Sequence, residues 1–408
     1  MYQQIIKYFD DNNAINGAQF GFRAGMGTQD AIGKLIDQIL SAFEHGEYAL
    51  LSVYDISKAF DCINHKFLIS KLRHYGFDRS SCAMISSYFR GRSQIVRVGS
   101  ECSRPLPVEC GTAQGSILGP LLFIIFLNDL PASLNGVVPV FYADDTSTIS
   151  RSRILEDVVG KAAHTSGDVE KWFNCNGFSL NRDKSAELLF TLRNHNLQLD
   201  RSSLNILGVH IDPKLTWSMH GEALSGKLCS AVFLLRRLSC TVDGSVLRVT
   251  YFAVFHSQIS YCILHWGHSA ICSRMFALQR RAVRVVGGLA YTADCKATFI
   301  RLRIMTLPSL YIYRCLQYII RNYSKYTSCG FECGYNIREK ENLRLERHRI
   351  YKSRCGTNYW GVKFFNALPK NIRQLPEKKF DKHIRQFLLD KAFYAFDEFL
   401  RGAASISP

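Results

Sequence analysis

Two adjacent aspartates, Asp144 and Asp145, follow the short apolar run Val137 to Val140. Because Asp favours turns, the pair predicts the tip of a β-hairpin. A third aspartate, Asp55, ends a separate apolar run, Tyr48 to Tyr54. Three carboxylates from two strand ends can converge on a pair of divalent cations, which clamp the attacking and leaving oxygens of a phosphoryl transfer. The alternative for an aspartate pair in a turn is a solvated loop.

A glycine-rich run, Gly111 to Pro120, lies between these two features. Glycine lets the backbone approach a ligand closely, and Pro120 suits the first turn of the apolar helix expected over Leu121 to Leu130. A glycine-rich loop before a helix can support an anionic ligand. A structural turn before a core helix explains the run equally well, so both interpretations stay open.

The remaining elements must position these residues. Helices are expected over residues 1–9, from 28 onward, and over 64–74, 83–89 and 155–173, and short strands over 94–98, 105–108, 146–150, 186–191 and 207–212. Helices that alternate with short, antiparallel strands predict an α+β fold.

Two details of these helices follow from side-chain types. Thr28 is expected to cap the helix that begins there, which carries Ile32, Leu35, Ile36 and Ile39 on one face. In the next helix, Phe67, Leu68 and Leu72 are expected to face inward.

The second half of the chain is mostly helical in pattern. Leu224, Leu228, Val232 and Leu235 form one stripe. A further helix over residues 274–286 carries Arg280, Arg281 and Arg284, which could track a phosphate backbone or form a solvated face.

The apolar stretch from Val246 to Trp266 is interrupted by Arg248, His256 and Gln258. A charge at the centre of a bilayer is costly, so a buried core helix is expected there rather than a membrane span.

The net charge is +17, from 51 basic and 34 acidic residues. Such an excess favours a polyanionic partner, with nucleic acid ahead of an anionic membrane surface. The 14 cysteines contain no CxxC pair and are expected to be free thiols. Cys329, Cys333, His348 and Cys355 have residue types that suit zinc, but their spacing is irregular for a compact zinc knuckle.

Six short motifs follow one another along the first half of the chain. They are Gln19-Phe20-Gly21-Phe22-Arg23, Asp55 with Ala59-Phe60-Asp61 and His65, Gly111 with Gln114-Gly115-Ser116 and Leu118-Gly119-Pro120, Tyr142-Ala143-Asp144-Asp145, Leu180-Asn181 with Lys184, and Leu207-Gly208-Val209. In this order they resemble the motifs of reverse transcriptases. The alanine before the two aspartates is similar to non-LTR (LINE) retrotransposon enzymes, and Phe365-Asn366-Ala367-Leu368-Pro369 resembles the jockey-like clade.

The resemblance implies an α+β right-hand polymerase that copies RNA into DNA during target-primed retrotransposition. Partial fingers and palm would occupy residues 1–215, a helical thumb 216–290, and a mostly helical C-terminal extension 291–408. The implied partners are an RNA template, a DNA primer or target and dNTPs, with no membrane, and the implied location is the nucleus or the cytoplasm.

The resemblance also implies roles for single residues. Asp55, Asp144 and Asp145 would be catalytic and hold two Mg²⁺ (or Mn²⁺) ions, because hard oxygen ligands suit these cations. Lys184 would approach the pyrophosphate as stabiliser or proton donor, unless it is a surface lysine. Phe60 would lie under the incoming sugar and reject a 2′-hydroxyl by its bulk, unless it is a core aromatic. The other implied site residues are Gln114, Gly115 and Tyr142 for the nucleotide, and Leu207 and Gly208 (primer grip) and Arg23 (fingers) for nucleic acid.

An Arg-Pro-Ile string of a preceding fingers segment and the endonuclease domain of full-length elements are not found in the sequence. An N-terminally truncated polymerase is therefore expected. Two hypotheses follow: an active RNA-directed DNA polymerase, or a truncated, inactive remnant that binds nucleic acid through its basic surface.

Overall fold

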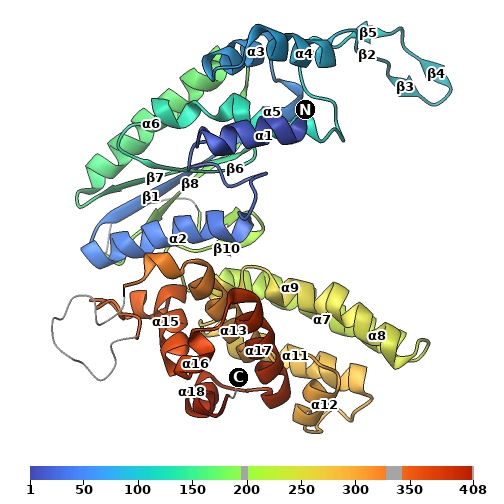
Figure 1. The fold of residues 1–408 in the computed structure, drawn as a ribbon, viewed down its shortest axis with the longest axis vertical. Coiled ribbons are helices and arrows are strands. Elements are labelled where there is room, and N and C mark those ends of the chain that lie inside the picture. The colour runs from blue at the N-terminus through green and yellow to red at the C-terminus, as the bar shows by residue number, and fades with distance from the viewer. Residues whose placement is uncertain (194–200, 328–341, 407–408) are drawn as a thin grey trace. The chain divides into compact units, whose positions relative to one another are not determined.

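The computed structural model describes residues 1–193, 201–327 and 342–406. It forms two compact units, Met1–Leu207 and Gly208–Pro408, drawn in Figure 1. The expected α+β fold is confirmed. The division of residues 216–408 into a thumb and a C-terminal extension stays a prediction.

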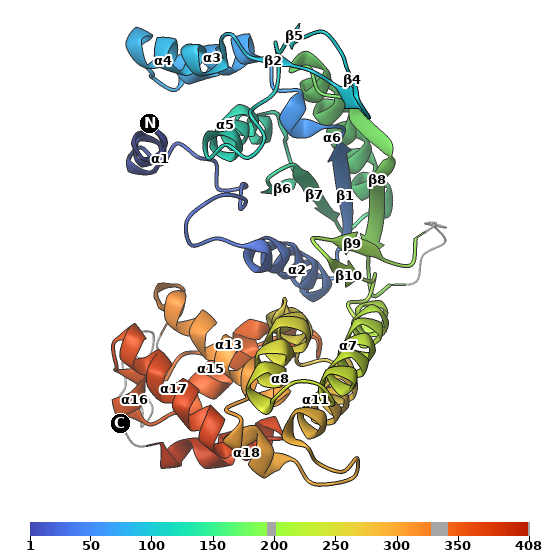
Figure 2. The ribbon, with the colours of Figure 1, turned by 90° about the vertical axis from the view of Figure 1, so that its right-hand side faces the viewer.

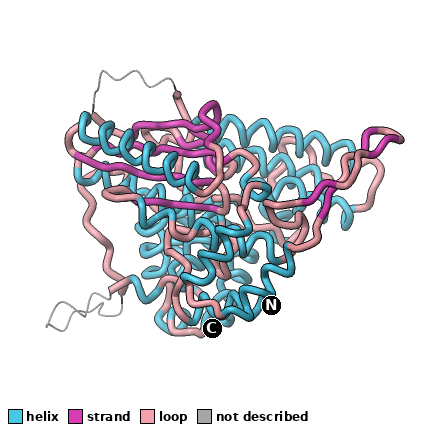
Figure 3. Tube along the Cα trace, turned by 90° about the horizontal axis from the view of Figure 1, so that it is seen from above, coloured by secondary structure: helices cyan, strands magenta, loops and turns pink. Residues whose placement is uncertain are grey.

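A four-stranded antiparallel sheet is the centre of the first unit. Its strands lie in the order β6 (Val138–Tyr142), β7 (Asp145–Ser152), β1 (Tyr48–Ile56) and β8 (Leu180–Phe190), and they run side by side in Figure 3. Because β1 pairs on both sides, it is an interior strand with its backbone hydrogen bonds satisfied. The strand predicted to end at Asp55 is thus, with β7, one of the two interior strands of the sheet.

Two amphipathic helices cover the two faces of the sheet, α2 (Thr28–His45) and α6 (Leu155–Cys175), as Figure 2 shows. Successive residues of a strand point to opposite faces. Leu50 of β1 packs in an apolar cluster with Val158 and Ala162 of α6. Its neighbour Ala49 pairs with Arg151 of β7, whose side chain contacts α2.

Helix α5 (Leu118–Leu127) is apolar on every side, with the sequence LGPLLFIIFL. A helix of this kind must be buried all round, and its residues from Leu121 to Leu127 are at most 2% exposed. Figure 1 shows three further helices near it: α1 (Tyr2–Asp11), α3 (His65–His74) and α4 (Arg79–Phe89).

The hairpin predicted from residues 94–98 and 105–108 is confirmed as an exposed arm. Its short strands are β2 (Ser93–Gln94), β3 (Arg97–Val98), β4 (Glu101–Cys102) and β5 (Leu106–Pro107), with β2 paired to β5 and β3 to β4. The arm extends away from the helices of the first unit in Figure 1.

Two local predictions are wrong. Thr28 is the first residue of α2 rather than its cap, because Gly27 takes that position and its N–H donates to Asp30 Oδ2 at 2.7 Å. Phe67 is 43% exposed, since burial of Leu68 and Leu72 turns the preceding residue of α3 toward solvent.

The strand expected over residues 207–212 is confirmed in part, as the shorter strand β10 (Val209–Ile211). Strand β9 (Leu204–Ile206) ends before Leu207, and β10 (Val209–Ile211) begins after Gly208. Leu207 and Gly208 both have positive φ values, 48° and 79°. A strand cannot contain two such residues in succession, so they form a turn.

The second unit is helical. Its long helices are α7 (Ser218–Leu238), α11 (Ile271–Gly287), α13 (Leu307–Arg321), α15 (Thr357–Ala367) and α17 (Glu377–Lys391), and shorter ones are α12 (Lys296–Arg301), α16 (Lys370–Arg373) and α18 (Phe396–Gly402). The stripe predicted on α7 is buried, and it consists of Leu224, Leu228, Val232 and Leu235. Gln279 of α11 is fully buried and satisfied: it donates to Tyr251 Oη and Met305 O and accepts from Leu307 N.

The segment from Val246 to Trp266 is buried in part but is no continuous helix. It contains α8 (Gly244–Tyr251), a π-helical turn over 252–256, α9 (Ser257–Ser260) and α10 (Ile263–Trp266), with Cys262 at a φ of 51°. Within the described residues, none of the helices has the length and apolar character to cross a membrane.

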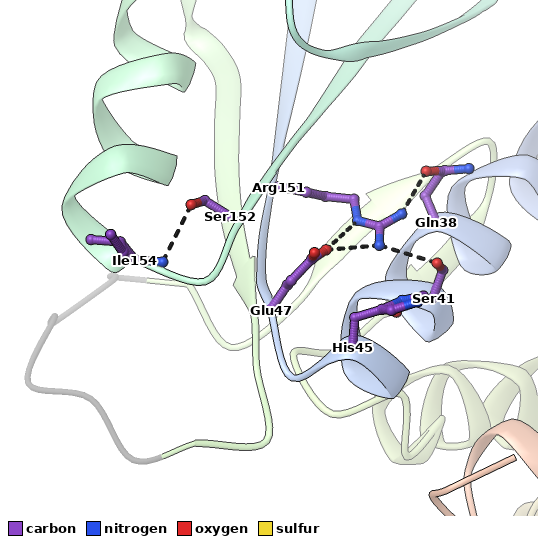
Figure 4. Close-up of polar contacts among 7 residues, drawn as sticks. All are labelled: Gln38, Ser41, His45, Glu47, Arg151, Ser152 and Ile154. Atoms are coloured by element: carbon purple, nitrogen blue, oxygen red, sulfur yellow. Dashed lines mark hydrogen bonds and ion pairs between the residues drawn. The ribbon is translucent and has the colours of Figure 1, made fainter.

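A polar cluster beside α2 fixes this helix to the sheet (Figure 4). Arg151 of β7 donates through Nε and Nη2 to Glu47 Oε2 at 3.0 and 2.8 Å, through Nη1 to Gln38 Oε1 at 3.0 Å, and through Nη2 to Ser41 Oγ at 3.1 Å. Only 22% of the Arg151 side chain is exposed. A guanidinium that serves three partners in fixed directions cannot be replaced by a simple ammonium group.

We expect Arg151→Lys to lower the free energy of unfolding by about 1–2 kcal/mol, because a single ammonium loses most of these charge-assisted hydrogen bonds. Urea denaturation followed by far-UV circular dichroism measures the change. The control is Lys161→Ala, which breaks the exposed Lys161–Asp157 pair of α6 (2.9 Å) and should cost less than about 0.5 kcal/mol. Equal losses in both variants would contradict a special role for Arg151.

Candidate active site

The antiparallel register brings the three predicted aspartates to one end of the sheet. Strands β1 and β7 pair as far as Tyr54 opposite Thr146, so Asp55 and Asp145 are the next residues on the two strands. The two-residue turn of the β6–β7 hairpin consists of Ala143 and Asp144, and Asp145 follows it as the first residue of β7. The predicted hairpin tip is therefore confirmed, and two strand ends place their carboxylates beside each other.

Burial and the neighbouring charges both change the pKa of Asp145. Its pKa is raised above the ordinary value, first by partial desolvation, then by the charges of Asp144 and Asp55. Like charges on adjacent strands repel, and the protonated form relieves the repulsion. Because the residue stays in contact with solvent, water screens part of the effect.

A β-bulge next to Asp55 sets its local geometry. The pairing of β1 with β8 shifts between Val53 and Asp55. In the bulged segment, Ser185 Oγ accepts the Asp55 N–H at 3.4 Å and donates to Asn181 O at 2.8 Å. Bulges re-aim side chains and terminate pairing, and here the bulge occurs at the carboxylate.

Lys184 belongs to the same bulged segment. Its Nζ lies 4.0 Å from Asp55 Oδ2, and 71% of its side chain is exposed. An exposed pair at this distance contributes little to stability. Lys184 is thus an exposed lysine near Asp55, and its approach to a pyrophosphate stays a prediction.

The glycine-rich loop and Phe60 border a cavity of about 450 Å³. The lining residues are Phe60, Thr112, Ala113, Gln114, Gly115, Ser116, Ile117, Gly119 and Pro120. Phe60 also stacks on Phe123 of the core, with ring centroids 4.4 Å apart. The two interpretations of Phe60 are therefore compatible, since one face of its ring is a core contact and the residue also lines the cavity.

Close contacts hold the start of this loop. Gly111 has a φ of 81°, and a Cβ there would lie 2.8 Å from Asp61 O. His65 Nε2 lies 2.7 Å from Gly111 O, and its ring stacks on Phe89 with centroids 4.0 Å apart. Sequence analysis gave Asp61 and His65 no role, although both belong to the motif that begins at Asp55.

The end of the loop is held by Ser116. Tyr88 Oη donates to Ser116 Oγ at 2.6 Å, and this oxygen accepts the N–H groups of Leu118 and Gly119, each at 3.1 Å. Two donors at the start of α5 are thus satisfied within the protein, which favours the structural interpretation of the loop over an anion site at the helix N-terminus. Gln114 Nε2 reaches back to Asp61 Oδ1 at 3.2 Å.

The other predicted site residues have different surroundings. Tyr142 pairs with Asp145 directly beside the hairpin turn. Arg23 folds back on its own segment, where Nη1 donates to Asn16 O at 3.3 Å and to Gln19 O at 3.2 Å. Leu207 and Gly208 form the turn described above.

The three predicted arginines of α11 differ in exposure. Arg281 is exposed and its guanidinium lies over the Tyr291 ring, 5.6 Å from the centroid. Arg280 lies over the Phe276 ring, and Arg284 Nε donates to Ala293 O at 2.7 Å. Arg284 thus has a structural partner, and Arg281 has the most exposed side chain of the three for a phosphate.

Carboxylate oxygens are the donors that Mg²⁺ and Mn²⁺ prefer, so Asp55, Asp144 and Asp145 fit these ions in chemical type. Desolvation and the nearby charges of Asp144 and Asp55 raise the pKa of Asp145, and a cation would offset both effects. Within residues 1–193, 201–327 and 342–406, however, no three His, Cys, Asp or Glu side chains form a ready-made metal site. The zinc prediction at residues 329–355 depends on Cys329 and Cys333, which lie outside the described residues.

The first 211 residues match the model of the reverse transcriptase (RNA-dependent DNA polymerase) family. The chain belongs to this family. Within it, the predicted likeness to jockey-like non-LTR retrotransposon polymerases is confirmed by the relatives described next.

The chain is 29% identical over 296 residues to the probable RNA-directed DNA polymerase from transposon BS of Drosophila melanogaster. The alignment covers 67% of this chain and 33% of the relative. It is 28% identical over 289 residues to the probable RNA-directed DNA polymerase from transposon X-element of the same organism, with 66% of this chain and 32% of the relative covered. It is 29% identical over 227 residues to the RNA-directed DNA polymerase from mobile element jockey, also of Drosophila melanogaster, with 52% of this chain and 25% of the relative covered. The chain thus spans about a third or less of the length of these relatives.

Among solved structures, a telomerase from Candida albicans aligns over 79% of this chain and 52% of its own, with a TM-score of 0.44 and 13% identity. A likeness at this level carries no conclusion about function.

We expect Asp145→Asn to raise the melting temperature of the metal-free protein at pH 7 by about a degree, because it removes a charge that the fold disfavours. A carboxyl whose folded pKa is raised contributes stability below its unfolded pKa and loses it as pH rises through the folded pKa. The difference should therefore vanish near pH 3–4. Thermal melts in EDTA measure it.

The matched control is Asp183→Asn, which removes an exposed carboxylate from β8. It should leave the melting temperature unchanged at either pH. A melting temperature for Asp145→Asn that is equal to or below that of the wild type at pH 7 would contradict the repulsion.

Proposed function

We propose that this chain is an RNA-directed DNA polymerase that adds dNTPs to the 3′-hydroxyl of a DNA primer on an RNA template. The observation that carries the proposal is the register that sets Asp55 and Asp145 next to each other, with Asp144 in the adjoining turn, in a chain of the reverse transcriptase family. The net charge of +17 suits a nucleic-acid partner.

The proposal assigns a role to each residue of the site. Asp55, Asp144 and Asp145 hold two Mg²⁺ (or Mn²⁺) ions. When bound, these ions supply electrostatic stabilisation of the attacking and leaving oxygens. Lys184, exposed and 4.0 Å from Asp55, turns toward the pyrophosphate and stabilises its charge or donates a proton.

The cavity beside Phe60 accommodates the nucleotide. Gln114 and Gly115 line it, and the Phe60 ring forms the wall that a 2′-hydroxyl would meet. Because Phe60 is stacked on Phe123, the ring cannot move aside without losing a core contact. A fixed aromatic wall of this kind excludes a ribose by bulk and accepts a deoxyribose.

In the wider proposal, the primer is nicked target DNA, the template is the RNA of a retrotransposon, and the reaction is target-primed reverse transcription in the nucleus or the cytoplasm. Support comes from the names of the curated relatives, which are polymerases of transposon BS, X-element and jockey.

We expect the wild type to extend oligo(dT) on poly(rA) with dTTP in the presence of Mg²⁺, and Asp144→Asn to reduce extension by about 10³-fold, because removing an electrostatic stabiliser of the transition state has costs of this order. Primer extension on denaturing gels is the measurement. The control is Asp183→Asn, an exposed carboxylate of β8 that should extend at the wild-type rate.

The alternative, an inactive remnant that binds nucleic acid, predicts a different result. In that case neither the wild type nor Asp144→Asn extends the primer, while both bind the hybrid equally and with a strong dependence on salt. That result would overturn the proposed polymerase activity.

We expect Phe60→Ala to raise the incorporation of rUTP relative to dTTP by about 10- to 100-fold, the range that a steric contact in a pocket supplies. Phe60→Tyr keeps the ring and should keep the wild-type ratio. Single-nucleotide extension with each substrate gives the two efficiencies, and a thermal melt shows whether each variant is folded. A folded Phe60→Ala with an unchanged ratio would leave Phe60 as a core aromatic only.

A further inference from the structure

The turn that carries Asp144 begins with a residue in an unfavourable backbone conformation. Ala143 has a φ of 56° and is 6% exposed. The left-handed region is disfavoured for residues that have a Cβ, and such a residue keeps this conformation only when its surroundings impose it. The direction of the Asp144 and Asp145 side chains depends on this peptide, so the contacts of Ala143 decide where the carboxylates lie.

Gln19 supplies those contacts from a distant part of the chain. Its side-chain Oε1 accepts the Ala143 N–H at 3.0 Å, and its Nε2 lies 3.4 Å from Ala143 O. The same Oε1 accepts the Gly21 N–H at 2.8 Å. Gln19 is only 3% exposed, so these bonds are sheltered from water and the groups would be left unsatisfied without it.

The backbone around Gln19 is attached to the same hairpin. Gln19 and Phe141 form a parallel bridge, in which Phe20 N donates to Phe141 O and Phe141 N donates to Ala18 O, both at 2.8 Å. Gly21 lies so close that a Cβ there would overlap Ala143 N. The segment from Ala18 to Gly21 therefore lies closely against the end of β6 and the turn.

We propose that Gln19 is a positioning residue for the carboxylates of Asp144 and Asp145, which acts by holding the Ala143 peptide through its buried amide. This proposal rests on the proposed polymerase function and adds a residue to which sequence analysis gave no role. Gln19 does not touch a reacting group; it acts through the backbone of the turn.

The test compares Gln19→Leu, which keeps the size of the side chain and removes its hydrogen bonds, with two further variants. Gly21→Ala disturbs the same turn by a different contact. Asn128→Leu is the matched control, because the Asn128 amide attaches the same N-terminal segment elsewhere: it accepts from Asn16 N at 2.7 Å and donates to Ala14 O at 2.8 Å. All three variants are expected to lose some thermal stability.

Two measurements separate positioning from stability. Hydrogen–deuterium exchange of the Ala143 amide should become about 10-fold faster or more in Gln19→Leu and Gly21→Ala, but not in Asn128→Leu. Binding of Mn²⁺, followed by the EPR signal of the free ion, should weaken about 10-fold or more in the first two variants and stay unchanged in Asn128→Leu, since supporting residues of a metal site have effects of this order.

The proposal is overturned if Ala143 exchanges at the wild-type rate in Gln19→Leu, or if Mn²⁺ binds that variant as tightly as the wild type. It is equally overturned if Asn128→Leu shows the same two changes. Failure of the polymerase function has a different signature, in which the wild type and Asp144→Asn bind Mn²⁺ equally weakly and neither extends a primer.

Discussion

The register of the four-stranded sheet is the constraint on which the first unit depends, because it brings three carboxylates to one end of the sheet. Asp55 and Asp145 come directly after the paired residues Tyr54 and Thr146, and Asp144 lies in the adjoining turn. Desolvation and, after it, the charges of Asp144 and Asp55 raise the pKa of Asp145. The aspartates do not stabilise this arrangement; the sheet and its apolar faces hold it against their repulsion.

The sheet can do this because its register is strongly specified. A slip of one residue would turn Leu50 away from the apolar cluster at α6 and break the Arg151 contacts at α2. The all-apolar helix α5 adds a core that continues under the cavity wall through Phe60 and Phe123. Energy gained by burial far from the aspartates thus maintains an unfavourable arrangement of charge where divalent cations are proposed to bind.

Backbone irregularities are found in the same region as the charges. The bulge opposite Asp55, the positive φ of Ala143 and the positive φ of Gly111 each occur in one of the segments that form the site. Each is over-determined by its neighbours, namely Ser185, Gln19 and the Asp61 backbone. Of the three, only Ala143 is strained, since glycine adopts a positive φ freely. Strain that the surroundings impose is typical of functional sites.

The sequence by itself determined the element types, the α+β class and the three aspartates at strand ends, because apolar periodicity and turn residues are local signals. It also determined the family, since six motifs in a fixed order identify a family more specifically than any one of the motifs alone. Only the tertiary structure decided which residues hold the three aspartates and the glycine-rich loop in place. Gln19 and Ala143 are 124 residues apart in sequence, and Tyr88 and Ser116 are 28 apart. Such contacts arise from long-range packing that no local pattern encodes.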